Sequence, residues 1–174
     1  MTAAQAVELV RPGDRVAVAG LGGLGAVAVH AARAQGARHV TAVVRSPEKA
    51  ALARRLGYDA ATDDPPDVAY DTVLDVSGSV DAVGVLLRAV RPGGRVGVYG
   101  VYDRPLPVDL NRLAEFGELS LSGGHLAPAC FPEALELLGL VDGDLVVTGQ
   151  HRLDRLPDAL GQADRPRLKE IVLP

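Results

Sequence analysis

A glycine-rich stretch near the start of the chain limits the possible fold more than any other feature. Residues 15–25 read RVAVAGLGGLG. The run at 15–19 is apolar and β-branched, which predicts a buried strand, and residues 23–34 repeat apolar side chains at helical spacing. Gly20, Gly22 and Gly25 therefore fall at a strand-to-helix turn. Such a turn needs a positive φ angle, close packing of helix on strand and bare backbone beside a phosphate, and glycine meets all three needs.

The start of the helix at 23–34 supplies a second indication. Its free backbone amides point at the glycine turn, and the helix dipole favours negative charge there. A strand at residues 39–44 follows, so the glycines stand in a strand–helix–strand context rather than alone. We therefore predict that the pyrophosphate of a dinucleotide cofactor binds this turn. The alternative is a glycine turn with a purely structural role.

Length and composition exclude several classes of protein. The 174 residues suffice for one α/β domain with a sizeable core but not for two of ordinary size. The net charge is −4 and no basic cluster is present, so a nucleic-acid partner is not expected. No apolar stretch approaches the roughly 20 residues that cross a bilayer, and no signal peptide is recognisable. The single cysteine, Cys130, agrees with a reducing compartment, and we expect a cytoplasmic protein without a membrane partner.

The rest of the chain alternates between helical and extended patterns. This alternation predicts an α/β protein with a doubly wound, mostly parallel sheet and helices on both faces, a Rossmann fold. Further helices are expected at residues 1–10, 46–56, 77–90, 108–116, 131–140 and 156–160. Further strands are expected at 59–62, 71–76, 95–101, 119–122, 144–148 and 168–173. The helix at 77–90 is expected to bury Ala82, Leu86, Leu87 and Val90.

The end of the second strand bears on the choice of cofactor. NAD-binding domains usually place an acidic residue about twenty residues after the glycine turn, on the ribose 2′-hydroxyl. Here Val44 is followed by Arg45 and Ser46, and Lys49 lies one turn into the next helix. A guanidinium and a hydroxyl bind a 2′-phosphate that a carboxylate would repel, so we predict NADP(H) rather than NAD(H). Alternatively, Arg45 and Lys49 are solvated surface charges, with Arg45 stacking on the adenine.

Taken in order, these segments resemble the cofactor-binding half of the medium-chain dehydrogenases, the zinc-type alcohol and polyol dehydrogenases. The similarity covers nearly the whole chain, and SGGHLAPACFPEALELL resembles the polyol branch in particular. It implies an oxidoreductase that transfers a hydride to or from an alcohol or carbonyl carbon. The matching segments are VELVRPGDRVAVAGLGGLG, VVRSPEKAALARRLG, LRAVRPGGRVGVYGV, VDLNRLAEFGELSLSGGHL and HRLDRLPDAL with LKEIVLP.

The resemblance also implies which residues touch the cofactor. The pyrophosphate would lie on the glycine motif, the adenosine ribose beside the second strand, and the nicotinamide near two later turns. In that order the residues are Gly20, Gly22, Gly23, Leu24 and Gly25; then Arg45, Ser46 and Lys49; then Val76, Ser77, Gly100, Val101 and Tyr102. Lys169 matches a basic position that can reach the phosphates, or is a solvated surface lysine.

The zinc site of this family is not expected here. In the family the catalytic zinc and the substrate pocket come largely from a domain that precedes the cofactor-binding part, and this sequence starts at Met1 just before that part. Cys130 and His125 are two potential ligands, too few for a zinc centre. We therefore expect residues 1–174 to form one NADP(H)-binding domain without zinc. Residues 124–174 correspond to the segment that packs on the missing domain in relatives.

Four residues are candidates for chemistry: His125, Tyr102, Asp103 and Ser77. All are expected near the nicotinamide, where without zinc the developing alkoxide needs a hydrogen-bond donor such as His125 or Tyr102. The alternative is that His125 caps a turn and Tyr102 covers the cofactor. Asp75 is expected to bind neighbouring backbone rather than act as a base.

The closing apolar runs LVVTG and LKEIVLP have no evident sheet to join. Unpaired strand edges favour association, so we expect these strands to pack on a second copy or on a partner protein. The resemblance implies a homodimer, because relatives pair their cofactor sheets edge to edge. Two other functions stay open: a non-catalytic or split NADP(H)-binding subunit that needs a partner domain, and an enzyme that uses the nucleotide for a non-redox reaction.

Overall fold

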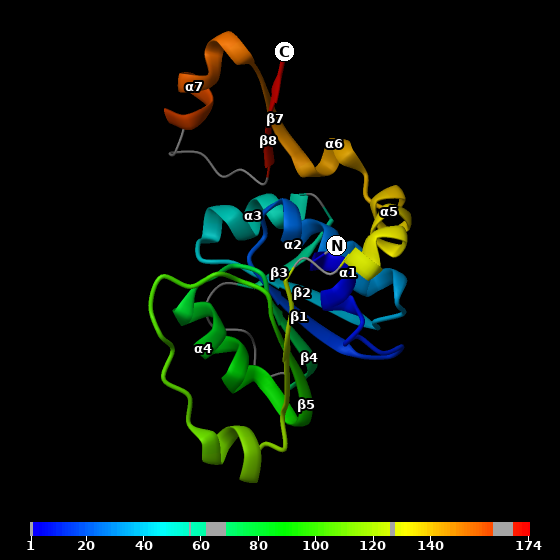
Figure 1. Ribbon diagram of the computed structural model, residues 1–174, viewed down its shortest axis with the longest axis vertical. Coiled ribbons are helices and arrows are strands. Elements are labelled where there is room, and N and C mark those ends of the chain that lie inside the picture. The colour runs from blue at the N-terminus through cyan, green and yellow to red at the C-terminus, as the bar shows by residue number, and fades with distance from the viewer. Residues whose placement is uncertain (1, 56, 62–68, 126–127, 162–168) are drawn as a thin grey trace.

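The computed structural model describes residues 2–55, 57–61, 69–125, 128–161 and 169–174 (Figure 1). The helices and helical turns are α1 (Thr2–Val7), α2 (Gly23–Ala34), α3 (Pro47–Arg55), α4 (Val80–Ala89), the π-helical η1 (Asn111–Glu115), η2 (Pro128–Cys130), α5 (Phe131–Gly139), α6 (Gly143–Val146), η3 (Leu153–Arg155) and α7 (Leu156–Gly161). The strands are β1 (Arg15–Ala19), β2 (His39–Val43), β3 (Asp59–Ala61), β4 (Tyr70–Asp75), β5 (Val90–Val98), β6 (Ser120–Gly123), β7 (Val147–Arg152) and β8 (Lys169–Leu173).

The central sheet has six parallel strands in the order β3-β2-β1-β4-β5-β6. The chain builds outward from β1 to β3, then returns to the other side of β1 and continues to β6. This reversal between β1 and β4 creates a crevice at the carboxyl ends of the strands, where open α/β sheets bind ligands. The doubly wound α/β fold predicted from the sequence is confirmed.

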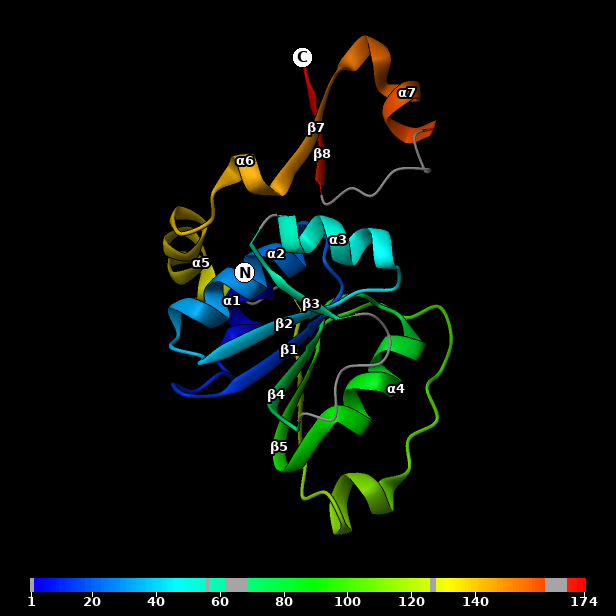
Figure 2. The ribbon, with the colours of Figure 1, turned by 180° about the vertical axis from the view of Figure 1, so that it is seen from behind.

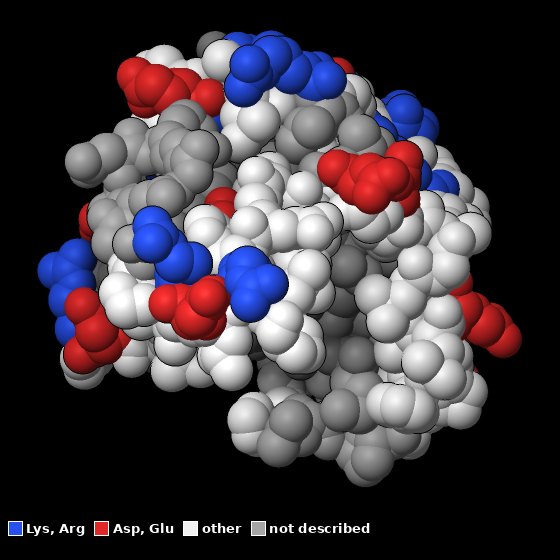
Figure 3. Space-filling view, turned by 90° about the horizontal axis from the view of Figure 1, so that it is seen from above, with Lys and Arg blue, Asp and Glu red and all other residues white. Residues whose placement is uncertain are grey.

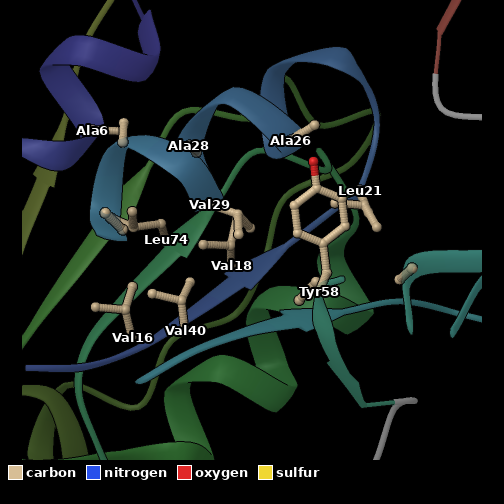
Figure 4. Close-up of a cluster of buried hydrophobic side chains, with 14 of the residues drawn as sticks. Ala6, Val16, Val18, Leu21, Ala26, Ala28, Val29, Val40, Tyr58 and Leu74 are labelled. Carbon is tan, nitrogen blue, oxygen red and sulfur yellow. The ribbon is translucent and has the colours of Figure 1, made fainter. Parts of the chain in front are cut away.

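Alternate side chains of β1 supply two cores, one on each face of the sheet. Val16 and Val18 pack on the face that α1, α2 and α3 cover, whereas Ala17 and Ala19 face α4. Figure 4 shows Val16, Val18 and Val29 together with Tyr58 in the first of these cores. Because burying one such aliphatic side chain contributes about 1.5–3 kcal/mol, the two cores hold the helices that carry the site.

A buried ion pair fastens α1 to the amino end of the sheet. The Arg95 Nη2 atom lies 2.5 Å from Asp14 Oδ2, and the Arg95 Nε atom donates to the Leu9 carbonyl at 2.8 Å. Thr72 Oγ1 donates to the same carboxylate oxygen at 2.9 Å. These polar groups satisfy one another inside the protein, as buried charges must.

Several predicted boundaries need correction. The strand expected at 144–148 begins only at Val147, because the Asp142 side chain caps the amide of Asp144 at 3.0 Å and starts the short helix α6. The helix expected at 108–116 is reduced to η1, where Asp109 accepts from the Asn111 amide at 2.9 Å. The fifth strand spans Val90–Val98 rather than 95–101. In α4 the buried side chains are Val83, Val85 and Leu86, while Ala82 and Leu87 are half-buried.

The closing strands pair with each other rather than remaining single. β7 and β8 form a parallel two-stranded sheet, which stands with α7 beyond the main body in both ribbon views (Figures 1 and 2). His151 Nε2 lies 2.6 Å from Glu170 Oε2 across this pair. In the described part of the chain no third strand joins this sheet, so each strand keeps one open edge.

Charge is dispersed over the end of the molecule from which β7, β8 and α7 project. Figure 3 shows basic and acidic groups interspersed on this face with broad uncharged areas between them. Across the described ranges, no helix is long and apolar enough to span a lipid bilayer.

Candidate functional site

A cleft of about 600 Å³ opens at the carboxyl edge of the sheet, between β1 and β4. It is bounded by the glycine turn, the end of β2, the start of α3, the turn from β4 to α4, and the loop after β5. Its lining residues are Gly20, Leu21, Gly22, Gly23, Leu24, Gly25, Val43, Val44, Arg45, Lys49, Val76, Ser77, Gly78, Ser79, Val80, Asp81, Ala82, Val101, Asp103 and Arg104. The volume is typical of a small-molecule or cofactor site.

The glycine turn is too crowded for any larger residue. Gly20 has a φ of +95°, and a Cβ atom there would lie 2.8 Å from the Cα atom of Ser77. A Cβ atom on Gly25 would lie 1.7 Å from the Gly20 carbonyl oxygen. The glycines therefore let α2 approach the end of β1 and let the two loops that form the cleft touch.

The amides at the start of α2 are left available to a ligand. The N-cap residue Gly22 has extended backbone (φ −108°, ψ −164°) and provides no capping side chain, and the first turn carries no acidic residue. The start of α4 differs, because Ser79 Oγ accepts from the Ala82 amide at 3.4 Å and Asp81 lies in the first turn. An anionic group in the cleft is therefore favoured at α2 and disfavoured at α4.

Asp75 organises the second loop of the cleft. This buried carboxylate accepts from the Ser77 hydroxyl at 2.6 Å, from the Ser77 amide at 3.1 Å and from the Gly78 amide at 3.3 Å. It also accepts from the Tyr102 hydroxyl. A Cβ atom on Gly100 would lie 2.5 Å from Asp75 Oδ2, so Gly100 packs against this carboxylate and does not line the cleft. Asp75 thus binds neighbouring groups, in line with the expectation from the sequence.

Tyr102 belongs to the hydrogen-bond network around Asp75. Burial, followed by the hydrogen bond to Asp75 and the charge of that carboxylate, raises the pKa of the Tyr102 phenol well above its usual range. The phenol therefore stays protonated and gives its one O–H to Asp75. In this geometry it has no second proton to donate to a substrate oxygen.

Two basic side chains lie at the β2 end of the cleft. Both Arg45 and Lys49 line it, and burial together with the positive charge of Arg45 lowers the pKa of Lys49. Throughout the described ranges neither forms an ion pair. Ser46 does not line the cleft, since its Oγ accepts from the Lys49 amide at 3.2 Å at the start of α3. Two adjacent cations without an acidic partner form a site that a bound anion would stabilise.

Lys169 reaches the glycine turn from β8. A Cβ atom added to Gly23 would lie 3.3 Å from Cδ of Lys169, so the lysine stem passes over the start of α2. Lys169 itself does not line the cleft, so its stem, from β8, packs on the turn that carries the free amides.

The wall formed by the start of α4 and the loop after β5 contains residues that the sequence analysis did not single out. Arg104 Nη2 lies 3.3 Å from Asp81 Oδ1, which links the loop after β5 to the first turn of α4. Gly78 and Ser79 also line the cleft, and the Ser-Gly-Ser turn after a buried strand was the available signal for them. No local pattern marks the Arg104–Asp81 pair, because its two residues come from separate elements.

His125 lies outside the cleft. It is exposed after β6, and the preceding Gly124 packs on α1, where an added Cβ atom would lie 2.1 Å from Gln5 Oε1. The nearby Cys130 donates to Glu8 Oε1 at 3.2 Å, and this hydrogen bond raises the pKa of the thiol. Of the residues that the structure describes, no three His, Cys, Asp or Glu side chains are grouped so that they could hold a metal ion. The described residues therefore do not provide the ligands of a zinc centre.

Most of the predicted cofactor residues come together in the cleft. Those that line it are Gly20, Gly22, Gly23, Leu24, Gly25, Arg45, Lys49, Val76, Ser77 and Val101. Those that do not line it are Ser46, Gly100 and Tyr102. His125, which was predicted to transfer a proton, does not line it either.

Comparison with known proteins gives the family. Residues 23–140 match the family described as zinc-binding dehydrogenase, in its C-terminal, cofactor-binding half. This chain belongs to the zinc-binding dehydrogenase family. Erythritol/L-threitol dehydrogenase of Mycolicibacterium smegmatis is 29% identical over 161 residues, which are 84% of this chain and 44% of that protein. L-threonine 3-dehydrogenase of Bacillus velezensis is 31% identical over 177 residues, 92% of this chain and 51% of that protein. The chain thus spans about half the length of the curated relatives it matches.

Solved structures share the fold of this dehydrogenase-family chain. A Sinorhizobium meliloti protein described as a zinc-binding dehydrogenase, bound to NADP, superposes with a TM-score of 0.85 at 23% identity over 99% of this chain and 57% of its own. An Escherichia coli alcohol dehydrogenase in complex with NADH superposes with a TM-score of 0.83 at 18% identity over 98% of this chain and 56% of its own. Neighbours of this fold thus include one bound to NADP and one bound to NADH.

Proposed function

We propose that residues 1–174 form the NADP(H)-binding domain of an oxidoreductase of the medium-chain dehydrogenase type. The observation that carries this proposal is the cleft at the switch point between β1 and β4, where the uncapped start of α2 faces Arg45 and Lys49. The nicotinamide, when bound, would supply hydride transfer to or from an alcohol or carbonyl carbon. The chain's own residues bind and orient it.

The pyrophosphate is assigned to the glycine turn. Its negative charge would be met by the free amides of α2 and by Lys169, whose aliphatic stem lies beside Gly23. Gly20 and Gly25 support this fit, because without side chains they let α2 and the loop after β4 close tightly at the turn.

The 2′-phosphate is assigned to Arg45 and Lys49. A charge-assisted hydrogen bond contributes about 1.5–3 kcal/mol, and among the described residues neither cation forms an ion pair with a carboxylate that would compete with the phosphate. We expect NADP⁺ to bind about ten- to a hundredfold more tightly than NAD⁺. Isothermal titration calorimetry with each of the two nucleotides tests this expectation.

Two matched arginine variants show whether the preference for NADP⁺ depends on Arg45 in particular. Arg45→Ala should remove most of the preference for NADP⁺ and leave NAD⁺ affinity unchanged, whereas Arg152→Ala on the exposed face of β7 should change neither. Equal affinities of the unaltered protein for the two nucleotides would contradict the assignment to NADP(H). No binding of either nucleotide would contradict the function itself.

The proton donor to the substrate oxygen is assigned to His125 rather than Tyr102. The Tyr102 proton is engaged by Asp75, whereas the His125 imidazole is exposed beside the end of β6. Because His125 lies outside the nucleotide cleft, this assignment requires the reacting group of the substrate to lie beyond the cleft, beside β6. NADP⁺-dependent oxidation of erythritol, sorbitol or L-threonine, the compounds named for relatives, provides the assay. His125→Ala should abolish turnover and leave cofactor affinity intact, and unchanged turnover would remove His125 from the mechanism.

A homodimer is the proposed assembly. β6 is the edge strand of the central sheet, and its Leu121 side chain is 56% exposed. Pairing of two β6 edges would satisfy their open backbone groups and cover this apolar surface. Light scattering coupled to size exclusion should give twice the chain mass, and Leu121→Lys should shift the protein to a monomer.

The second candidate is a cofactor-binding module that needs a partner domain. Apolar side chains on α5 support it, since Phe131, Leu135 and Leu138 are 53%, 57% and 54% exposed. Exposed apolar side chains grouped on one helix are typical of a surface that contacts another protein. Co-purification with a second polypeptide would favour this candidate.

We also propose that the protein is cytoplasmic, because its single cysteine agrees with a reducing compartment.

A further inference from the structure

The outlying strands β7 and β8 pair with each other while burying very little apolar surface. Both strands are described in full, and none of their side chains is fully buried. Val172 and Leu173 of β8 are 39% and 46% exposed. The register of a strand is strongly specified where one of its faces is buried and weakly specified where neither face is. Hydrophobic burial therefore does not fix how β8 aligns with β7, and the alignment depends on other contacts.

A polar pair of side chains joins the two strands. The His151 Nε2 atom lies 2.6 Å from Glu170 Oε2, and the two side chains are only 11% and 17% exposed. The Thr148 hydroxyl lies 3.3 Å from the Lys169 carbonyl oxygen and 3.4 Å from Glu170 Oε1, at the point where the register of the two strands shifts. A shielded hydrogen bond to a carboxylate is costly to lose, because its partners would stay largely hidden from water without it.

Gly149 makes room for this pair. Glu170 is the Cα partner of Gly149 across the two strands, and a Cβ atom added to Gly149 would lie 2.0 Å from Glu170 Oε2. The Glu170 carboxylate therefore lies over the one position of β7 that has no side chain, and so reaches His151 two residues further along. The pair depends on this glycine as well as on its two members.

Lys169 and Glu170 are adjacent residues of opposite charge. Adjacent residues of a strand point to opposite faces. Glu170 points to His151, whereas the Lys169 stem lies beside Gly23, with its Cδ atom 3.3 Å from a Cβ atom added there. A slip of β8 by one residue would exchange these faces and bring Glu170 to the position of Lys169. A carboxylate would then lie beside the free amides of the glycine turn.

We propose that the His151–Glu170 pair fixes the register of β8, so that Lys169 rather than Glu170 faces the glycine turn. His151 and Glu170 are then positioning residues, since neither lines the cleft and both act through Lys169. The register itself depends only on contacts within β7 and β8. Its consequence for a nucleotide rests on the proposed function, because a negative charge at the start of α2 would disfavour an anionic ligand.

Disulfide trapping measures the register without any nucleotide. All proteins in this experiment carry Cys130→Ser, so that the chain has no other thiol. Gln150→Cys with Ile171→Cys joins two Cα partners of the observed register, whereas Gln150→Cys with Val172→Cys joins the partners of the slipped register. Neighbouring strands lie about 4.7–4.9 Å apart, a spacing that suits a disulfide. The first pair should oxidise about tenfold faster than the second, whose side chains point to opposite faces.

Two substitutions in the trapping proteins remove the polar pair by different routes. His151→Ala deletes the imidazole, and Gly149→Ala displaces the Glu170 carboxylate without altering either partner. Each should lower the ratio of the two oxidation rates about tenfold. His151→Gln, whose amide can still donate to the carboxylate, should keep most of the ratio, and Arg152→Ala on the exposed side of β7 should keep all of it. An unchanged ratio in both His151→Ala and Gly149→Ala, with each variant folded by circular dichroism, would overturn the proposal.

Calorimetry with NADP⁺ tests the consequence for the cleft. His151→Ala and Gly149→Ala should each weaken NADP⁺ binding about fivefold to tenfold. In the His151→Ala protein, oxidation of the Gln150→Cys and Ile171→Cys pair should restore the affinity, because the disulfide then holds the register. If the affinity is not restored, the register does not place Lys169 at the turn, and this half of the proposal is wrong. If the unaltered protein does not bind NADP⁺, the proposed function fails, while trapping still decides the register.

Discussion

Gly25 lies where the first turn of α2 meets the end of β1, and the space for a side chain is already filled by the Gly20 carbonyl group. Gly20 is equally constrained, by its positive φ and by Ser77 on the neighbouring loop. At the residue scale, the shape of the glycine turn depends on the absence of side chains at these two positions. A single added methyl group should therefore have a large effect at either of them.

The prediction at the residue scale concerns Gly25→Ala. The added methyl group must push α2 away from the Gly20 carbonyl oxygen, and such overpacking costs about 1–3 kcal/mol. We expect weaker NADP⁺ binding by calorimetry and a lower free energy of unfolding in urea. Gly139→Ala is the matched control, because nothing lies within 4 Å of its added Cβ atom. If both variants bind NADP⁺ like the unaltered protein, the glycine turn does not hold the phosphate.

At the element scale, α2 carries two separate functions. Its amino end faces the cleft, while its buried face packs on β1 and on Tyr58. His30 lies on this helix with Nε2 2.8 Å from the Tyr58 hydroxyl. Burial, and then the positive charge of Arg33, lower the pKa of His30. Protonation of His30 therefore costs more free energy in the folded protein than in the unfolded chain.

The prediction at the element scale follows from the lowered pKa of His30. The unfolded chain takes up a proton on this histidine near pH 6.5, about its ordinary pKa, whereas the folded chain does so only at lower pH. The free energy of unfolding should therefore fall as the pH drops below about 6.5. Urea denaturation at pH 7.5 and 5.5 measures the loss, and His30→Gln should show a smaller one. The same loss in His30→Gln would contradict this origin of the pH dependence.

At the scale of the whole molecule, β8 connects the outlying two-stranded sheet to the cleft. Lys169 is the first residue of β8, and its stem lies on Gly23 at the start of α2. A phosphate at this turn would bind both the main sheet and the outlying one. In the proposed function, ligand binding would therefore restrain β8.

The prediction at the whole-molecule scale is that NADP⁺ slows amide exchange in β8. Binding of the pyrophosphate by Lys169 should restrain the strand that carries it, so hydrogen exchange of residues 169–173 should slow when NADP⁺ is added. Lys169→Ala should remove this protection and leave the protection of the glycine turn. Protection of β8 that persists in Lys169→Ala would show that the strand is held in another way.

Local sequence determined much of this protein. β1 and α2 begin and end where their periodicity and glycines indicate, because both elements depend on neighbours within a few residues. The same local signals predicted the parallel α/β fold and most residues of the cleft. They failed at residues 144–148, where one Asp142 cap outweighed an apolar run, and in α4, whose buried side the sheet selects.

Only the tertiary structure decided which side chains meet. The engagement of the Tyr102 hydroxyl by Asp75, the Arg104–Asp81 pair, the lysine of β8 above Gly23 and the His151–Glu170 pair all join residues from different elements. Their contacts depend on how the sheet orders its strands and on where the long loop after β5 returns. Hydrophobic periodicity carries no information about such distances, since it records only which face of an element is buried. The sequence by itself therefore determined a glycine-rich strand-to-helix turn in a parallel α/β sheet, whereas the folded molecule determined which side chains from other elements lie beside that turn.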